Sequence, residues 1–361
     1  MTQGKGILPG QVLRGRGAAS NAAGRFESTD REAVDDGWDL PEEARTIRTE
    51  VRQERARSAL SYNASPDLGF DRSVNPYRGC EHGCIYCYAR PSHAFLNLSP
   101  GVDFETKLIA RPGIGAVLAG ELRAKGYTPK VVVLGSNTDP YQPVEATARV
   151  TREVIAVLRD FNHPLGITTR GSLVERDIDI LAPMAALGLA RVGISVTTRD
   201  AGLARKMEPR APAPARRLLM IRRLSEAGIP VRVMVSPVIP GLTDHETEAI
   251  LEAARDAGAV AASSITLRLP REVAGLFRNW LEATMPDRAA KVMARVRELH
   301  GGRDYDPAFG VRMKGQGPWA DLARQRFEIA VRRLGLAVRM PPLRGDLFAV
   351  PGRAGDQLSL F

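Results

Sequence analysis

All three cysteines of this 361-residue chain lie close together, at Cys80, Cys84 and Cys87, in a C-x3-C-x2-C spacing. Disulfides need paired cysteines and an oxidising compartment, so an odd, clustered set argues against them. Thiolates this near to one another can bind a single soft metal centre. The spacing therefore predicts that the three cysteines are metal ligands.

The number of cysteines bears on which metal they bind. A structural zinc site needs four ligands, so His82 or His93 would have to supply the fourth. A cubane cluster has four irons, each normally held by one thiolate, so three cysteines leave one iron open. Open positions are typical of catalytic metals, whereas an electron carrier would want a fourth cysteine. We expect a catalytic [4Fe-4S] cluster. The alternatives are a nucleic-acid-binding protein stabilised by a structural zinc and a protein with a non-catalytic electron-transfer cluster.

Short apolar runs alternate with helical patterns over most of the chain. This alternation predicts βαβ units, with a parallel sheet and right-handed crossovers. Six such units favour an α/β fold of the partial (β/α)6 TIM-type barrel, with a doubly wound sheet as the alternative. The predicted strands are 72–75, 131–134, 166–169, 192–196, 231–235 and 264–267. The predicted helices are 145–160, 178–187, 215–227, 247–257, 273–285, 288–299 and 319–334.

Polar residues follow several of the predicted strands. The segments 135–139, 168–170 and 236–244 carry them, as does Ser195. Each segment alone is ordinary loop composition. In a barrel, however, the carboxyl ends of the strands form the active site. Their recurrence at successive strands predicts a shared ligand pocket.

Composition divides the chain into three parts: a tail over 1–60, the barrel over 61–270 and a helical extension over 271–361. The tail is poor in apolar periodicity and is expected to be mostly disordered, apart from an ordered strap at 14–26. The extension is rich in arginine and is expected to close the open side of the barrel.

The chain carries 51 Lys and Arg against 41 Asp and Glu, a formal net charge of +10. This charge permits a nucleic-acid partner, although codon usage in a GC-rich genome also yields arginine. No apolar run approaches the ~18 residues of a membrane helix, and the N-terminus has no signal-peptide core. We expect a cytoplasmic protein with no membrane segment; its oligomeric state stays open.

The cysteine motif, with Tyr86 before the third cysteine, resembles the signature of the radical S-adenosylmethionine (SAM) superfamily. The resemblance implies that the unligated iron binds the amino and carboxylate groups of SAM. Reduction then cleaves SAM to methionine and a 5′-deoxyadenosyl radical, which abstracts a substrate hydrogen. It also implies a reductant such as flavodoxin or ferredoxin.

The resemblance assigns roles to residues at the strand ends. Asn137 and Asp139 stand where the family's second-strand motif binds the amino group of SAM, and Arg170 would pair with the carboxylate. Ser195 matches a residue that contacts the ribose. The segment P-V-I-P-G-L-T-D, which contains Ile239, resembles the adenine-side motif, and Tyr86 would lie beside the adenine.

Longer stretches resemble the spore photoproduct lyase-like branch, whose members are often labelled DNA repair photolyases. They are N-P-Y-R-G-C-E-H-G-C-I-Y-C-Y-A-R, G-S-N-T-D-P-Y-Q-P, S-V-T-T and K-M-E-P-R-A-P. This branch favours a nucleic-acid substrate, with a protein or a small molecule left open. Spore photoproduct lyase returns a hydrogen atom from a cysteine thiol, and no fourth cysteine exists here. Tyr88 or Tyr141 would have to replace it.

Overall fold

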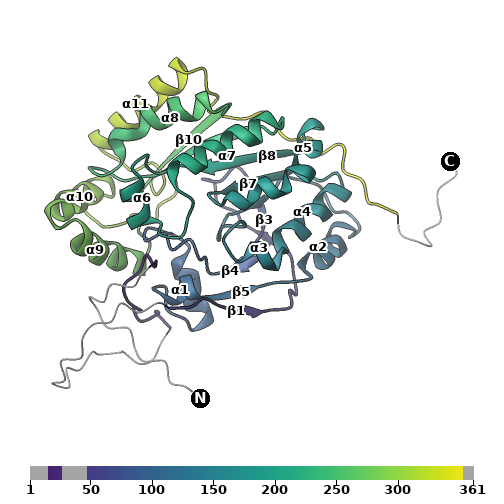
Figure 1. Ribbon diagram of the computed structural model, residues 1–361, viewed down its shortest axis with the longest axis horizontal. Coiled ribbons are helices and arrows are strands. Elements are labelled where there is room, and N and C mark those ends of the chain that lie inside the picture. Colours follow the sequence, from purple (N-terminus) through teal and green to yellow (C-terminus); the bar gives the residue numbers. More distant parts are fainter. Residues whose placement is uncertain (1–14, 27–46, 353–361) are drawn as a thin grey trace.

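A seven-stranded sheet carries the fold in the computed structural model, which describes residues 15–26 and 47–352 (Figure 1). Its strand order is β10-β9-β8-β7-β6-β3-β2. Six strands are parallel and follow one another in chain order, and β2 (Leu60–Tyr62) pairs antiparallel with β3. The parallel strands are β3 (Arg72–Val74), β6 (Val132–Leu134), β7 (Leu165–Thr169), β8 (Ala190–Ser195), β9 (Val231–Val238) and β10 (Ala261–Thr266).

This strand order decides between the two predicted architectures. A doubly wound sheet reverses its strand order at a switch point, and here the order never reverses. The edge strands β10 and β2 are not paired with each other, so the barrel stays open. The partial TIM-type barrel is therefore confirmed.

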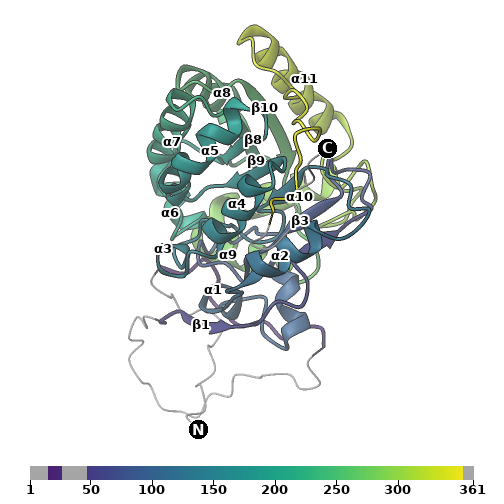
Figure 2. The same ribbon diagram turned by 90° about the vertical axis from the view of Figure 1, so that its right-hand side faces the viewer.

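Helices cover the outer face of the sheet, as the two views in Figures 1 and 2 show. Apolar residues of the strands, such as Val192, Ile194 and Val233, are buried beneath these helices. These helices are α2 (Ile114–Leu122), α3 (Glu145–Ala148), α4 (Val150–Asp160), η2 (Ser172–Asp177), α5 (Ile178–Ala186), α7 (Pro214–Glu226) and α8 (Thr247–Asp256).

The prediction of a single helix over 145–160 is wrong. The helix breaks at Arg149, whose φ of 53° is left-handed, and so forms α3 and α4. The buried carboxylate of Glu145 accepts the N–H of Thr151 at 2.9 Å and that of Arg152 at 3.3 Å. This side chain satisfies amides at the start of α4 that would otherwise lack partners.

A second, three-stranded sheet lies beside the barrel, in the order β1-β5-β4. Its strands are β1 (Glu50–Gln53), β5 (Lys107–Ala110) and β4 (Tyr77–Arg78). The short helices η1 (Arg90–Leu96) and α1 (Asp103–Thr106) pack next to it. Residues 50–53, which belong to the segment expected to be a tail, form β1 and pair with β5. Of the predicted strap, residues 15–26 are described; residue 14 and the segments 1–13 and 27–46 lie outside the described residues.

The arginine-rich extension lies at the open edge of the barrel. Helix α11 (Pro318–Arg333) packs on α8, and Ala337 bridges to the edge strand β10 at Ala261. Helices α9 (Glu272–Thr284) and α10 (Pro286–Leu299) pack against each other near α6 (Ala201–Met207) in Figure 1. Among the described residues, no helix combines the length and apolarity needed to cross a membrane.

Candidate active site

The loop that follows β4 places all three cysteines on the wall of one cavity. Cys80 and Cys84 are buried, and Cys87 is half-buried. The N–H of Cys80 donates to the carbonyl of Phe104 at 2.9 Å, and Arg90 Nε donates to the carbonyl of Cys84 at 2.9 Å. Hydrogen bonds to the backbone of Cys80 and of Cys84 therefore hold the loop in place.

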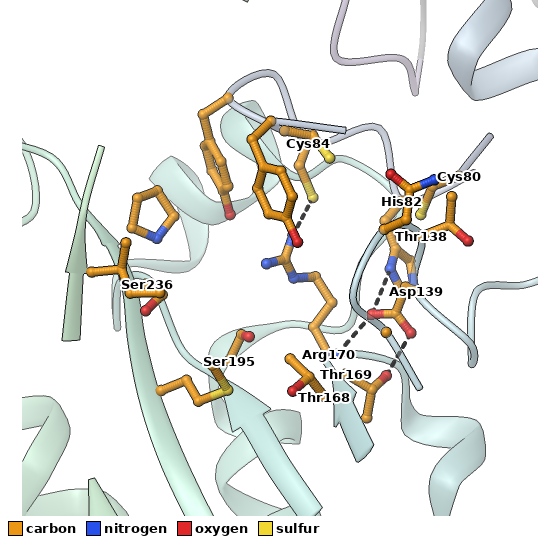
Figure 3. A pocket seen from close by; sticks show the side chains of 18 of the residues that line it. Cys80, His82, Cys84, Thr138, Asp139, Thr168, Thr169, Arg170, Ser195 and Ser236 are labelled. Atoms are coloured by element: carbon orange, nitrogen blue, oxygen red, sulfur yellow. Dashed lines mark hydrogen bonds and ion pairs between the residues drawn. The ribbon is translucent and has the colours of Figure 1, made fainter. Parts of the chain in front are cut away.

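The carboxyl ends of the sheet strands line the rest of this cavity (Figure 3), which measures about 170 Å³. Asn137 comes from the loop after β6, Arg170 follows β7 and Ser195 ends β8. Eight of the nine predicted site residues line it: Cys80, Cys84, Tyr86, Cys87, Asn137, Asp139, Arg170 and Ser195. Polar strand ends thus converge on the cysteine loop, as the sequence predicts.

Ile239 is the exception among the predicted site residues. It is fully buried in an apolar cluster that also contains Tyr86, and it does not line the cavity. Two of its neighbours from the same segment, Ser236 and Pro237, do line the cavity. Ile239 therefore packs in the core behind the cavity wall.

Asp139 ties the cysteine loop to the strand ends. Its carboxylate accepts the hydroxyl of Thr169 at 2.5 Å and the N–H of Arg170 at 2.9 Å, and it faces His82 Nδ1 at 3.4 Å. Burial by itself would raise the pKa of Asp139, but His82 and these donors hold the pKa at about 2. Because these groups occupy the Asp139 oxygens, the geometry favours Asn137 over Asp139 as the contact for a ligand's amino group.

Arg170 crosses the cavity toward the cysteine loop, as Figure 3 shows. Its Nη1 lies 2.5 Å from Cys84 Sγ, and its guanidinium lies 5.8 Å from the ring centre of Tyr86. Burial nevertheless raises the pKa of the Cys84 thiol to about 12. Keeping this sulfur deprotonated therefore requires more positive charge than Arg170 supplies.

Glu208 supports this site, although the sequence alone assigns it no role. Its buried carboxylate accepts hydrogen bonds from the hydroxyls of Tyr86 and Thr197 and from the guanidinium of Arg217. Burial would raise its pKa, but Arg217 and Arg170 lower the pKa to about 2. Glu208 therefore fixes Tyr86, the residue before the third cysteine. Tyr86 is 122 positions from Glu208 in the sequence, so only the stretch K-M-E-P-R-A-P pointed to Glu208.

The histidines do not complete a zinc site. His82 faces Asp139, while Nε2 of His93 lies 3.0 Å from the carbonyl of Lys107. Within residues 15–26 and 47–352, no three His, Cys, Asp or Glu side chains converge closely enough to hold one ion. A cubane differs from a single ion because each of its irons takes its own thiolate. Three thiols on one wall, two of them buried and the third half-buried, fit such a cluster.

The family model of the radical SAM superfamily matches residues 74–254, which is half of the chain. The chain therefore belongs to the radical SAM superfamily and is a radical SAM enzyme. An uncharacterized protein of Mycobacterium tuberculosis is 37% identical over 242 residues, covering 66% of this chain and 70% of that protein. An uncharacterized protein of Methanocaldococcus jannaschii is 27% identical over 174 residues, or 48% of this chain and 62% of that protein.

Solved structures of spore photoproduct lyase share this fold. The lyase complexed with dinucleoside spore photoproduct aligns with a TM-score of 0.58 at 14% identity, over 80% of this chain and 81% of that one. A variant with bound AdoMet and the same dinucleoside aligns with a TM-score of 0.57 at 14% identity, with the same coverage. The predicted likeness to spore photoproduct lyase is thus confirmed for the fold.

Proposed function

We propose that this protein holds a [4Fe-4S] cluster through Cys80, Cys84 and Cys87 and uses SAM to abstract hydrogen from a nucleic-acid substrate. The observation that carries the proposal is the shared cavity. The only three cysteines of the chain line it together with polar residues from successive strand ends. When bound, the cluster supplies the electron that cleaves SAM to methionine and a 5′-deoxyadenosyl radical.

The residues around the cavity would orient SAM. Arg170 carries a fixed positive charge with two parallel donors, which suits the carboxylate of SAM. Asn137 offers an amide oxygen for the amino group. Ser195 offers a hydroxyl for the ribose, and Tyr86 lies on the side where the adenine would stack. Asp139 would support these residues indirectly, because its carboxylate accepts a hydrogen bond from the backbone N–H of Arg170.

The mouth of the cavity supports nucleic acid as the substrate class. A shallow depression of about 280 Å³ adjoins it and shares Tyr88, Asn137 and Arg268 with it. Tyr88 and Phe95 are exposed residues, with 43% and 70% of their surface accessible. Arg268 lies 4.8 Å from the ring centre of Tyr88, and Arg25 lies 4.7 Å from that of Phe95. Exposed rings beside arginines are what stacking on bases and pairing with phosphates require.

The two tyrosines considered as hydrogen donors are placed differently. Tyr88 lines the cavity, and its hydroxyl donates to the carbonyl of Ser136 at 2.6 Å. Tyr141 is fully buried and does not line the cavity. Of the two, Tyr88 is therefore the residue that a substrate in the cavity could reach. We further propose a cytoplasmic location, where a flavodoxin or a ferredoxin would serve as the reductant.

The test uses full-length protein reconstituted without oxygen with iron and sulfide. After reduction with dithionite and addition of SAM, 5′-deoxyadenosine is quantified by mass spectrometry beside Cys84→Ala. We expect about four irons per intact chain and deoxyadenosine only from the intact protein. An intact, reducible cluster that neither binds nor cleaves SAM would overturn the proposal and favour the electron-transfer alternative. About one zinc per chain would favour the structural-zinc alternative.

A further inference from the structure

The strap, residues 15–26, lies against the back of the cysteine loop. Its backbone contacts Gly83, which stands between Cys80 and Cys84, and its residues bond to Glu105 behind the loop. We propose that the strap holds the cysteine loop in its metal-binding conformation, with Gly17 and Glu105 as positioning residues. This inference rests on the proposed function in one respect, because it takes the loop to be the cluster site.

The first contact requires a glycine. A Cβ built on Gly17 would lie 1.7 Å from the carbonyl oxygen of Gly83, closer than any real side chain can approach backbone. The two backbones therefore touch directly. Gly83 itself has a left-handed φ of 68°, and a Cβ there would lie 2.8 Å from Glu105 Oε2. Strap, loop and carboxylate are thus in contact at one point.

Glu105 joins the strap to the loop. Its carboxylate is fully buried and accepts the N–H of Gly17 and the N–H of Ala18, each at 2.9 Å. The same carboxylate pairs with Arg90 Nη2 at 2.5 Å, and Arg90 in turn donates to the carbonyl of Cys84. A buried carboxylate is stable only when its oxygens are paired in this way. The hydrogen bonds therefore run unbroken from the strap to a cysteine ligand.

Further contacts anchor the strap on either side of this point. Arg16 donates to the carbonyl of Glu105 at 3.0 Å and to that of Ile47 at 2.6 Å. Beyond it, the N–H of Val102 donates to the carbonyl of Ser20 at 3.2 Å. The strap ends at Arg25 and Phe26, beside the mouth of the cavity. Its contacts therefore extend from the cysteine loop to the substrate entrance.

Gly17→Ala tests this role, and Gly24→Ala in the same strap is its matched control. A Cβ on Gly24 meets its nearest atom at 3.5 Å, which is ordinary contact. In cluster-free, full-length protein, alkylation of Cys80 and Cys84 by iodoacetamide is followed by mass spectrometry. We expect Gly17→Ala to speed alkylation of Cys80 and Cys84 roughly tenfold. The variant loses the two hydrogen bonds from the strap to Glu105, so the cysteine loop opens more often. After reconstitution, the iron per chain of Gly17→Ala should fall, while Gly24→Ala should match the wild type.

The proposal would be overturned if Gly17→Ala showed the same alkylation rate and iron content as the wild type. It would also be overturned if Gly24→Ala changed these two values as much as Gly17→Ala does. Arg16→Ala provides a second test that crowds nothing, because it only removes an anchor of the strap. Arg16→Ala should also speed cysteine alkylation and lower the iron content per chain. Unchanged values would contradict the proposed role of the strap. Cysteine alkylation needs neither cluster nor SAM. A wild-type protein that makes no deoxyadenosine would therefore refute the proposed function and leave this measurement standing.

Discussion

Three buried carboxylates organise the residues around the cavity. Asp139 connects His82 to the end of β7, Glu208 fixes Tyr86, and Glu105 links the strap to Arg90. Each faces a cationic or hydrogen-bonding partner from a distant segment. A buried charge without such a partner is strongly unfavourable. These carboxylates therefore hold the cavity wall in place.

Glu208→Ala should destabilise the fold strongly. It would leave the buried guanidinium of Arg217 without its partner, a loss of about 3–5 kcal/mol when one member of a buried pair is removed. Urea unfolding of the cluster-free protein measures this loss. Glu282→Ala on the exposed face of α9 is the matched control and should change stability by less than ~0.5 kcal/mol. Equal midpoints for the two variants would show that Glu208 does not have this role.

At the scale of single residues, the sequence predicts the residues that line the cavity better than the residues that support them. The three cysteines follow from spacing alone, since their chemistry needs them within a few residues of one another. Glu208 is 122 positions from Tyr86, and no local pattern reports a contact of that separation. The side chain of Ile239 lies away from the cavity, and its contact with the adenine stays a prediction. Its motif resembles an adenine contact, yet its apolar side chain packs into the core.

Among the secondary-structure elements, the strand ends set the geometry of the site. Gly135 follows β6 with a left-handed φ of 88°, and a Cβ there would lie 1.9 Å from the carbonyl oxygen of Thr168. The loop that carries Asn137 therefore passes directly over the end of β7. Only glycine permits both this conformation and this approach.

Gly135→Ala should displace this loop and weaken SAM binding at least tenfold, because misplaced binding groups lose most of their contribution. Isothermal titration of the reconstituted protein with SAM measures the effect. The matched control is Gly166→Ala inside β7, where a Cβ meets its nearest atom at 3.6 Å. If both variants bind SAM like the wild type, the loop after β6 does not position the ligand.

Periodicity predicts the long elements and misses the short ones. All six parallel strands are found near their predicted places, because buried apolar runs give a strong signal. The strand predicted at 264–267 begins earlier, at Ala261, since alanine and serine give little apolar signal. The second sheet escapes prediction because β4 has two residues and β1 has four, all of them exposed in β1. Such strands are defined by their partners and not by their own pattern.

The chain has a net charge of +10, but some of its arginines already pair with carboxylates of the same chain and others do not. In the C-terminal extension, Arg326 pairs with Glu248 at 2.7 Å, and Arg333 pairs with Glu252. Arg268 at the mouth of the cavity differs, because its Nε is buried without a hydrogen-bond partner among the described residues. Much of the charge on α11 is therefore already neutralised within the fold, whereas Arg268 places a positive charge at the cavity entrance.

Arg268→Ala should weaken binding of a fluorescent single-stranded oligonucleotide and lower the slope of log K against log salt by about 1. Anisotropy titrations of the full-length protein at several salt concentrations give both values. The control is Arg255→Ala, an exposed arginine of α8 that lies beside Asp256 and away from the cavity mouth. If Arg268 contacts a phosphate, only Arg268→Ala should lower the slope. If the arginines act only through the net charge of the protein, both variants should change the slope by the same amount. A slope that is flat in the wild type, or equal in the two variants, would remove nucleic acid as the favoured substrate and leave a protein or a small molecule for the cavity.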